Sequence, residues 1–97
     1  MNYKVIIPPE IDDRIVEISN YIYGKSYSSK IATKVYKELY SSIENLNFLP
    51  YIYQEYHKWF RVVNVFNYRI FYKINEDKNE VRIHYIFWAW QDFSKIL

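Results

Sequence analysis

The second half of the sequence carries basic and polar aromatic side chains that could support phosphodiester chemistry. Arg and Lys can stabilise the negative charge that develops on a phosphorane, and His or Tyr can transfer the proton without a metal ion. The same side chains could instead form a docking surface for an acidic peptide or a nucleic-acid backbone. The candidates for a catalytic site are Arg61, Arg69, Lys73 and His84, with Tyr72, Arg82 and Tyr85 close to them in the sequence.

The overall charge does not decide between these two interpretations. The 97 residues include 13 Lys/Arg and 11 Asp/Glu, so the formal net charge is only +2. The charge is unevenly distributed, since residues 57–97 hold seven Lys/Arg against four Asp/Glu, a balance of +3. A local cationic face can attract phosphate on a nearly neutral protein, although an ordinary solvated sheet face has the same composition.

Other kinds of active site are disfavoured by the composition. The absence of cysteine excludes disulfides, thiolate metal ligands and cysteine nucleophiles. The single glycine excludes Gly-rich phosphate-binding loops, and two histidines far apart in the sequence make a poor metal site. We therefore expect neither a metal nor a cofactor. Asp12 and Asp13 fall in the first turn of a predicted helix, where the helix dipole accounts for them.

Strands must position the basic residues. Alternate positions of residues 66–74 are apolar or aromatic, which is typical of a strand with one buried face. Arg69 and Lys73 fall on the other face, which we expect to be left open. Further strands are predicted at residues 59–65 and 80–88, and short connections make an antiparallel meander of the three.

The strand at residues 80–88 also constrains the candidate site. On a regular strand, successive side chains point to opposite faces of the sheet. Arg82 and His84 would therefore share a face. His84 and Tyr85 would point in opposite directions, so we expect that they do not line the same site.

The first half of the sequence predicts a short strand, at residues 3–8, and then two helices. Pro9 suits the first turn of the first helix, isoleucines recur at helical spacing, and Gly24 is placed to end it in a left-handed conformation. The second helix should begin after an N-cap at Ser28 or Ser29 and continue to about Asn47. Residues 49–57 are expected to form a connecting loop.

Together these elements predict one α+β domain, residues 1–97, in the order β-α-α-β-β-β. Helices that precede an antiparallel sheet indicate a two-layer sandwich in which the helices cover one face. The N-terminus lacks a signal-peptide pattern, and no apolar run approaches the ~20 residues that span a bilayer. We therefore expect a cytoplasmic protein that does not interact with membranes.

The order and spacing of these segments resemble the RelE/ParE family of toxins from bacterial toxin–antitoxin systems. The similar segments are the opening "YKVII", the helix ending "ISNYIY", the segment "IATKVYKELYSSIENLNFLP", the strand pair "RVVNVFNYRIFYKI" and the ending "VRIHYIFWAWQDF". The resemblance implies a toxin that arrests growth. It also implies a cognate antitoxin that wraps the toxin with a helix and a strand and neutralises it.

The resemblance implies one of two targets. RelE-type toxins cleave mRNA in the ribosomal A site with basic and aromatic residues on the open sheet face, and Arg61 and Arg69 match the family's strand arginines. ParE-type toxins poison DNA gyrase and need no nuclease chemistry. Here Trp88 and Trp90 stand where the family often has His and Arg, and Trp cannot stabilise phosphorane charge as Arg does.

We therefore expect a toxin with ParE-like, gyrase-directed or other non-nuclease action. The candidates for partner binding are Trp59, Tyr72, Trp88 and Trp90, since aromatic residues anchor many interfaces. RelE-like mRNA cleavage on the ribosome is the alternative, and it would use the four catalytic candidates named above. A non-toxic module that binds only an antitoxin or another partner is a third possibility. A homodimer is also left open.

Overall fold

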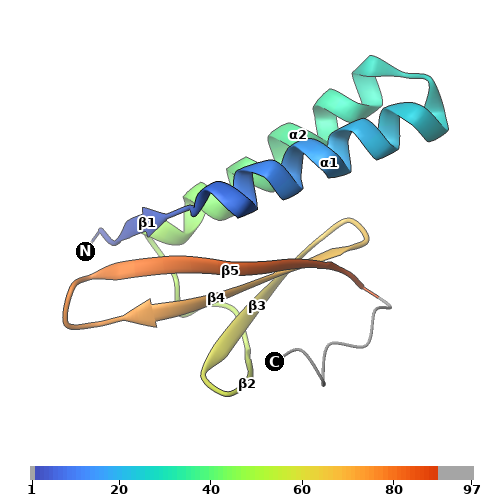
Figure 1. Cartoon of the computed structure of the whole chain (residues 1–97). Coiled ribbons are helices and arrows are strands. Elements are labelled where there is room, and N and C mark those ends of the chain that lie inside the picture. Colours follow the sequence, from blue (N-terminus) through green and yellow to red (C-terminus); the bar gives the residue numbers. More distant parts are fainter. Residues whose placement is uncertain (1, 90–97) are drawn as a thin grey trace.

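The computed structural model describes residues 2–89, which form two layers (Figure 1). Helices α1 (Pro9–Ser26) and α2 (Ser29–Glu44) form an antiparallel hairpin over one face of a sheet, and a 3-10 turn (Asn45–Asn47) follows α2. The strands are β1 (Lys4–Ile6), β2 (Glu55–His57), β3 (Phe60–Val65), β4 (Tyr68–Asn75) and β5 (Glu80–Trp88). The predicted α+β sandwich is confirmed.

The strand order in this sheet is β1-β5-β4-β3-β2. Strands β2 to β5 form an antiparallel meander, and β1 pairs in parallel with β5 at the far edge. Strand β2 lies where only a loop was expected. The sequence gives little sign of it, because it is three residues long and its turn into β3 lacks glycine. Lys58 and Trp59 instead adopt positive φ angles of 51° and 71° there.

The end of α1 also differs from the expectation. The helix continues past Gly24 to Ser26, and Tyr27 is the residue with left-handed φ (54°). An interior glycine costs a helix only about 1 kcal/mol relative to alanine, which neighbouring interactions can outweigh. The expected N-cap of α2 is confirmed, because the Ser28 hydroxyl accepts a hydrogen bond from the Ile31 amide.

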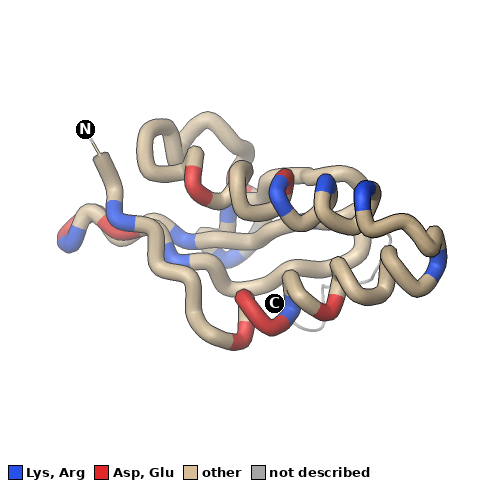
Figure 2. Tube along the Cα trace, turned by 90° about the horizontal axis from the view of Figure 1, so that it is seen from above, with Lys and Arg blue, Asp and Glu red and all other residues tan. Residues whose placement is uncertain are grey.

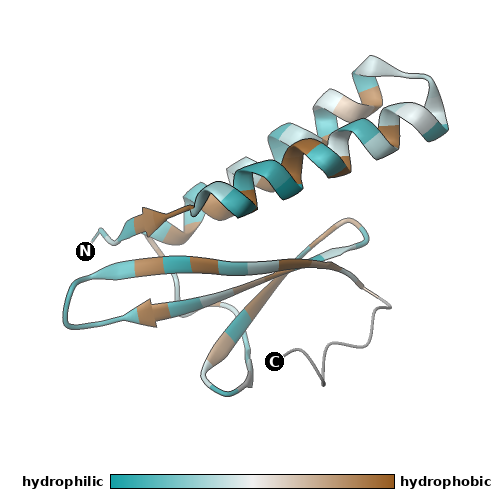
Figure 3. Ribbon diagram, viewed as in Figure 1, coloured by the Kyte–Doolittle hydropathy of each residue, from teal (hydrophilic) through white to brown (hydrophobic). Residues whose placement is uncertain are grey.

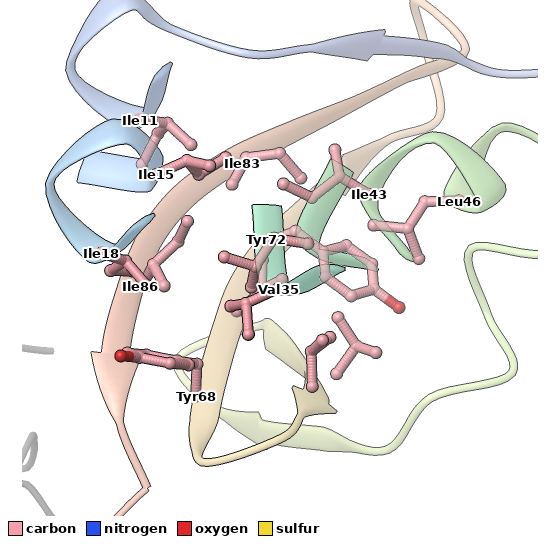
Figure 4. Packing of buried hydrophobic residues seen from close by; sticks show 14 of the residues in the cluster. Ile11, Ile15, Ile18, Val35, Ile43, Leu46, Tyr68, Tyr72, Ile83 and Ile86 are labelled. Carbon is pink, nitrogen blue, oxygen red and sulfur yellow. The ribbon is translucent and has the colours of Figure 1, made fainter. Parts of the chain in front are cut away.

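The main core lies between the helical hairpin and the sheet (Figure 4). Apolar residues recur along both helices (Figure 3), and the buried ones pack in one core with residues of the strands. Burial stops at Ile18 in α1 and begins at Ala32 in α2, so the tip of the hairpin projects beyond the sheet (Figure 1). The core side chains include Ile11, Ile15, Ile18, Val35, Leu39, Ile43, Leu46, Val63, Ile70, Tyr72, Ile83 and Ile86. Neither helix of the described range is long and apolar enough to cross a bilayer.

Candidate functional site

The face of the sheet turned away from the helices, here called the outer face, carries an aromatic cluster. Phe71 is fully buried there and packs edge-on against Phe60, with Val62, Tyr85 and Phe87 partly buried around them. Within residues 2–89 no helix covers this face, as expected, but its aromatic side chains bury one another. The cationic side chains of this face surround a small second core, and they do not stand on a bare sheet.

An extra residue in β5 sets the geometry of this face. Phe71 pairs with Tyr85 but Tyr72 pairs with Ile83, so His84 is inserted as a β-bulge. A bulge changes which face each following residue occupies. The rings of His84 and Tyr85 consequently both lie near Phe60, with ring centroids 5.3 and 5.8 Å from it. The expectation that these two side chains point to opposite faces is thus wrong.

Two cations lie beside the His84 ring. Lys73 Nζ is 4.4 Å from the ring centroid of Phe60, and Lys73 is directly opposite Arg82 in the strand register. Like charges in such positions repel one another, and an anion bound between them would relieve the repulsion. Burial lowers the pKa of His84, and the charges of Lys73 and Arg82 lower it further. The imidazole is therefore mostly neutral near pH 7 and can accept a proton.

These side chains line an open depression of about 560 Å³ next to the β4–β5 turn. Lys73, Arg82 and His84 form its basic side, and Glu76, Asp77 and Glu80 add acidic groups at the turn. The arrangement could bind a phosphate group at the basic side. Within residues 2–89, no group of three or more His, Asp or Glu side chains is placed to hold a metal ion.

Arg61 does not belong to this group. It is directly opposite Tyr72, whose side chain is in the main core, so Arg61 points to the helix-covered face. Its Nη1 donates a 2.8 Å hydrogen bond to the Tyr53 carbonyl, and its guanidinium lies 4.9 Å from the Tyr51 ring centroid. Arg61 therefore holds the segment that leads into β2.

Arg69 shares the outer face with Lys73, as the alternation predicted. The two residues are four positions apart on β4, which corresponds to about 13 Å along a strand. Arg69 lines a different depression, together with residues of β2 and β3 that include Glu55, Tyr56 and Asn64. Of the four catalytic candidates, the structure brings together only Lys73 and His84.

The candidates for partner binding lie in different environments. Tyr72 is fully buried, and its hydroxyl donates a 2.6 Å hydrogen bond to the Pro50 carbonyl, so it is a core residue and not a surface residue. Trp59 is 79% exposed in the β2–β3 turn. Trp88 is half-buried and packs against Tyr68. Trp90 lies outside the described residues.

One protein-family model matches most of this fold. Residues 5–89 match the model described as the ParE toxin of the type II toxin–antitoxin system, parDE. The chain belongs to the ParE toxin family. This range runs from β1 past the end of β5, and the predicted membership in the RelE/ParE group is confirmed. A comparison with individual curated proteins found no significant match.

One residue of the site was not singled out from the sequence of this ParE-family chain. The Phe60 ring contacts the Lys73 ammonium and the rings of His84 and Tyr85, yet Phe60 was expected only as part of a strand. These contacts of Phe60 depend on how β3, β4 and β5 pair, which the sequence pattern does not give.

Proposed function

We propose that this ParE-family toxin acts on DNA gyrase, or on another target without cutting RNA, and that its antitoxin neutralises it by binding. The observation that carries the proposal is the separation of the basic residues. A phosphodiester transition state needs its stabilising cations within hydrogen-bond reach of one phosphate. Arg61 is on the opposite face from Lys73 and is held by the Tyr53 carbonyl. Membership in the ParE family supports the same conclusion.

The exposed indole of Trp59 supports a role in docking. It lies at the tip of the β2–β3 hairpin, far more exposed than is usual for a tryptophan. Tryptophan is enriched among residues that dominate binding energies. We assign Trp59 to the surface that meets the target, and Trp88 to the surface that meets the antitoxin.

RelE-like cleavage of mRNA is the second candidate function, and one observation favours it. The bulge at His84 brings a neutral imidazole next to Lys73, Arg82 and Tyr85. In this case His84 would accept the proton from the attacking 2′-hydroxyl, and Lys73 and Arg82 would stabilise the phosphorane. The bond from phosphorus to the 5′-oxygen would then break, and the protonated His84 would return the proton to that leaving oxygen. Arg61 would have no part in the reaction.

Expression of the chain alone in a bacterial host separates these functions. Growth is followed after induction while new 5′ ends are mapped on cellular transcripts. We expect growth arrest with intact transcripts, and we expect His84→Ala to arrest growth as the parent does. Cuts within translated codons that disappear in His84→Ala would overturn the proposal in favour of the nuclease. Unimpaired growth, with folded protein present, would indicate that the protein is not a toxin and only binds a partner.

A further inference from the structure

The end of the helical hairpin, here called the basic end and defined as residues 18–37, holds only positive charge. It carries four of the chain's 13 Lys/Arg, at positions 25, 30, 34 and 37, and none of the 11 Asp/Glu. The remaining residues carry nine Lys/Arg against 11 Asp/Glu, a balance of −2. Figure 2 shows the separation, with basic residues in a row along α2 and acidic residues on the first half of α1. Although the net charge of the protein is small, one of its surfaces is therefore strongly basic.

Three of these lysines form one row on α2. Lys30, Lys34 and Lys37 are exposed and follow one another at spacings of four and three residues. The pitch of the α-helix places them within about 60° of one another around the axis, and the row extends over about 10 Å. The buried residues of α2 lie on the opposite side of the helix: Ala32, Val35, Leu39 and Ile43. The row is therefore a rigid line of positive charge that faces solvent.

The row does not stabilise the helix that carries it. Lys30 lies in the first turn of α2, which has no acidic residue, and a cation there opposes the helix dipole. Lys30 and Lys34 are one turn apart, so their ammonium groups repel each other. Glu38 lines the same shallow depression of about 500 Å³ as the three lysines, but its single charge offsets only part of theirs. Cations that lower the stability of the free protein favour a role in binding an anion.

The other side chains of the basic end suit a phosphate backbone better than a protein or a membrane. Tyr23 and Tyr27 are 51% and 85% exposed, and serine and threonine hydroxyls lie between the lysines. Lys, Ser, Thr and Tyr side chains make many of the phosphate contacts of DNA-binding proteins, whereas protein–protein interfaces are depleted in Lys and Ser. A helix that lies in a membrane surface presents Trp, Phe or Leu to it, and residues 18–37 contain none of these.

We propose that the basic end binds the phosphate backbone of double-stranded DNA and does not read its sequence. Each strand of B-DNA presents one phosphate per about 3.4 Å of the axis, so a rigid row of about 10 Å can meet about three phosphates. Lys25, in the last turn of α1, supplies a fourth charge. The readout of bases relies mainly on Arg, Asn and Gln, and of these residues 18–37 contain only Asn20. The inference does not rest on the proposed target, but such a contact would hold a gyrase-directed toxin beside the DNA on which gyrase acts.

The test is the fluorescence anisotropy of a labelled DNA duplex, titrated with the purified chain at salt concentrations from about 50 to about 200 mM. Contacts with four phosphates predict roughly a 100-fold loss of affinity over this range. The triple variant Lys30→Gln, Lys34→Gln, Lys37→Gln should bind at least tenfold more weakly at the lower salt, and the dependence of log affinity on log salt should fall to about a quarter. Its thermal midpoint should not fall below that of the parent, because Lys30 opposes the helix dipole.

A matched triple variant, Lys4→Gln, Lys58→Gln, Lys78→Gln, removes the same charge from exposed positions outside the basic end and should weaken binding by less than about threefold. Equal losses in the two triple variants would reduce the effect to net charge and overturn the inference. Tighter binding to RNA of the same length than to duplex DNA would also overturn it, as would a loss found only in Lys73→Gln with Arg82→Gln, which would place the nucleic acid on the outer face. The assay contains neither gyrase nor cells, so its outcome is independent of growth arrest and of gyrase inhibition.

Discussion

Arg61 and Arg69 lie on opposite faces of the sheet, although both belong to the central hairpin. Arg61 pairs with Tyr72 of the main core, whereas Arg69 pairs with Asn64 on the outer face. The segment that precedes β2 holds Arg61 through the Tyr53 carbonyl. A site that needs both guanidinium groups on one phosphate cannot form on this sheet. We therefore assign Arg61 a structural role. The prediction for Arg61→Ala follows from its separation from Arg69.

Arg61→Ala should lower the free energy of unfolding by about 1–3 kcal/mol, because it removes a hydrogen bond from a charged donor and a cation–π contact. The measurement is a urea titration followed by tryptophan fluorescence. Lys37→Ala, on an exposed helix face, is the control and should change stability by less than about 0.5 kcal/mol. An unchanged stability for Arg61→Ala together with complete loss of toxicity would contradict the structural role.

Tyr72→Phe should destabilise the protein by about 1–3 kcal/mol, because the buried Pro50 carbonyl loses its 2.6 Å hydrogen bond while the ring still fills the core. The matched control is Tyr27→Phe, since Tyr27 is 85% exposed and its hydroxyl can bond to water. Thermal unfolding of both variants measures the difference. Equal midpoints for the two variants would show that the Tyr72 hydroxyl does not stabilise the fold.

His84 should make stability depend on pH. Its pKa in the folded protein lies below the value of about 6.5 for an exposed histidine, because of burial and then the charges of Lys73 and Arg82. The unfolded state therefore binds a proton at a higher pH than the folded state does. The contribution of His84 to stability should be constant above a pH of about 6.5, which is the pKa in the unfolded state. It should fall as the pH drops below about 6.5, until His84 also binds a proton in the folded protein.

An NMR titration of the His84 ring measures this pKa directly. Lys73→Met removes one of the neighbouring charges and should raise the pKa of His84. In His84→Gln, the decline of stability below about pH 6.5 should become shallower. A pKa of His84 at or above that of an exposed histidine would show that the ring is neither desolvated nor close to the two cations.

Gly24→Ala should stabilise the protein by about 1 kcal/mol, which is the difference in helix propensity. Gly24 lies within α1, no atom is within 4 Å of an added Cβ, and its φ is not in the left-handed region. Far-UV circular dichroism during thermal unfolding provides the measurement. A lower midpoint for Gly24→Ala would mean that the helix ends at Gly24, as its residue type had suggested.

Much of the fold could be predicted from local patterns. Isoleucines at helical spacing indicate the buried stripe of α1, and alternation along residues 66–74 indicates the buried face of β4. The bounds of β5 also agree with the expected range of 80–88. These patterns are reliable because one buried face imposes a period on the sequence.

The candidate site could not be predicted in the same way, because it depends on which residues pair across strands. The bulge at His84 reverses the face of Tyr85, and nothing in the segment "VRIHYIFW" marks it. The face of Arg61 was ambiguous, since Val62 and Val63 are both apolar and break the alternation.

The most direct test of the central claim is a supercoiling assay with purified DNA gyrase, relaxed plasmid and the purified chain. We predict that the chain inhibits supercoiling, that His84→Ala inhibits it equally, and that neither protein cuts mRNA in a translating extract. Unaffected supercoiling, together with mRNA cleavage that is lost in His84→Ala, would contradict the account and make the outer face a nuclease site.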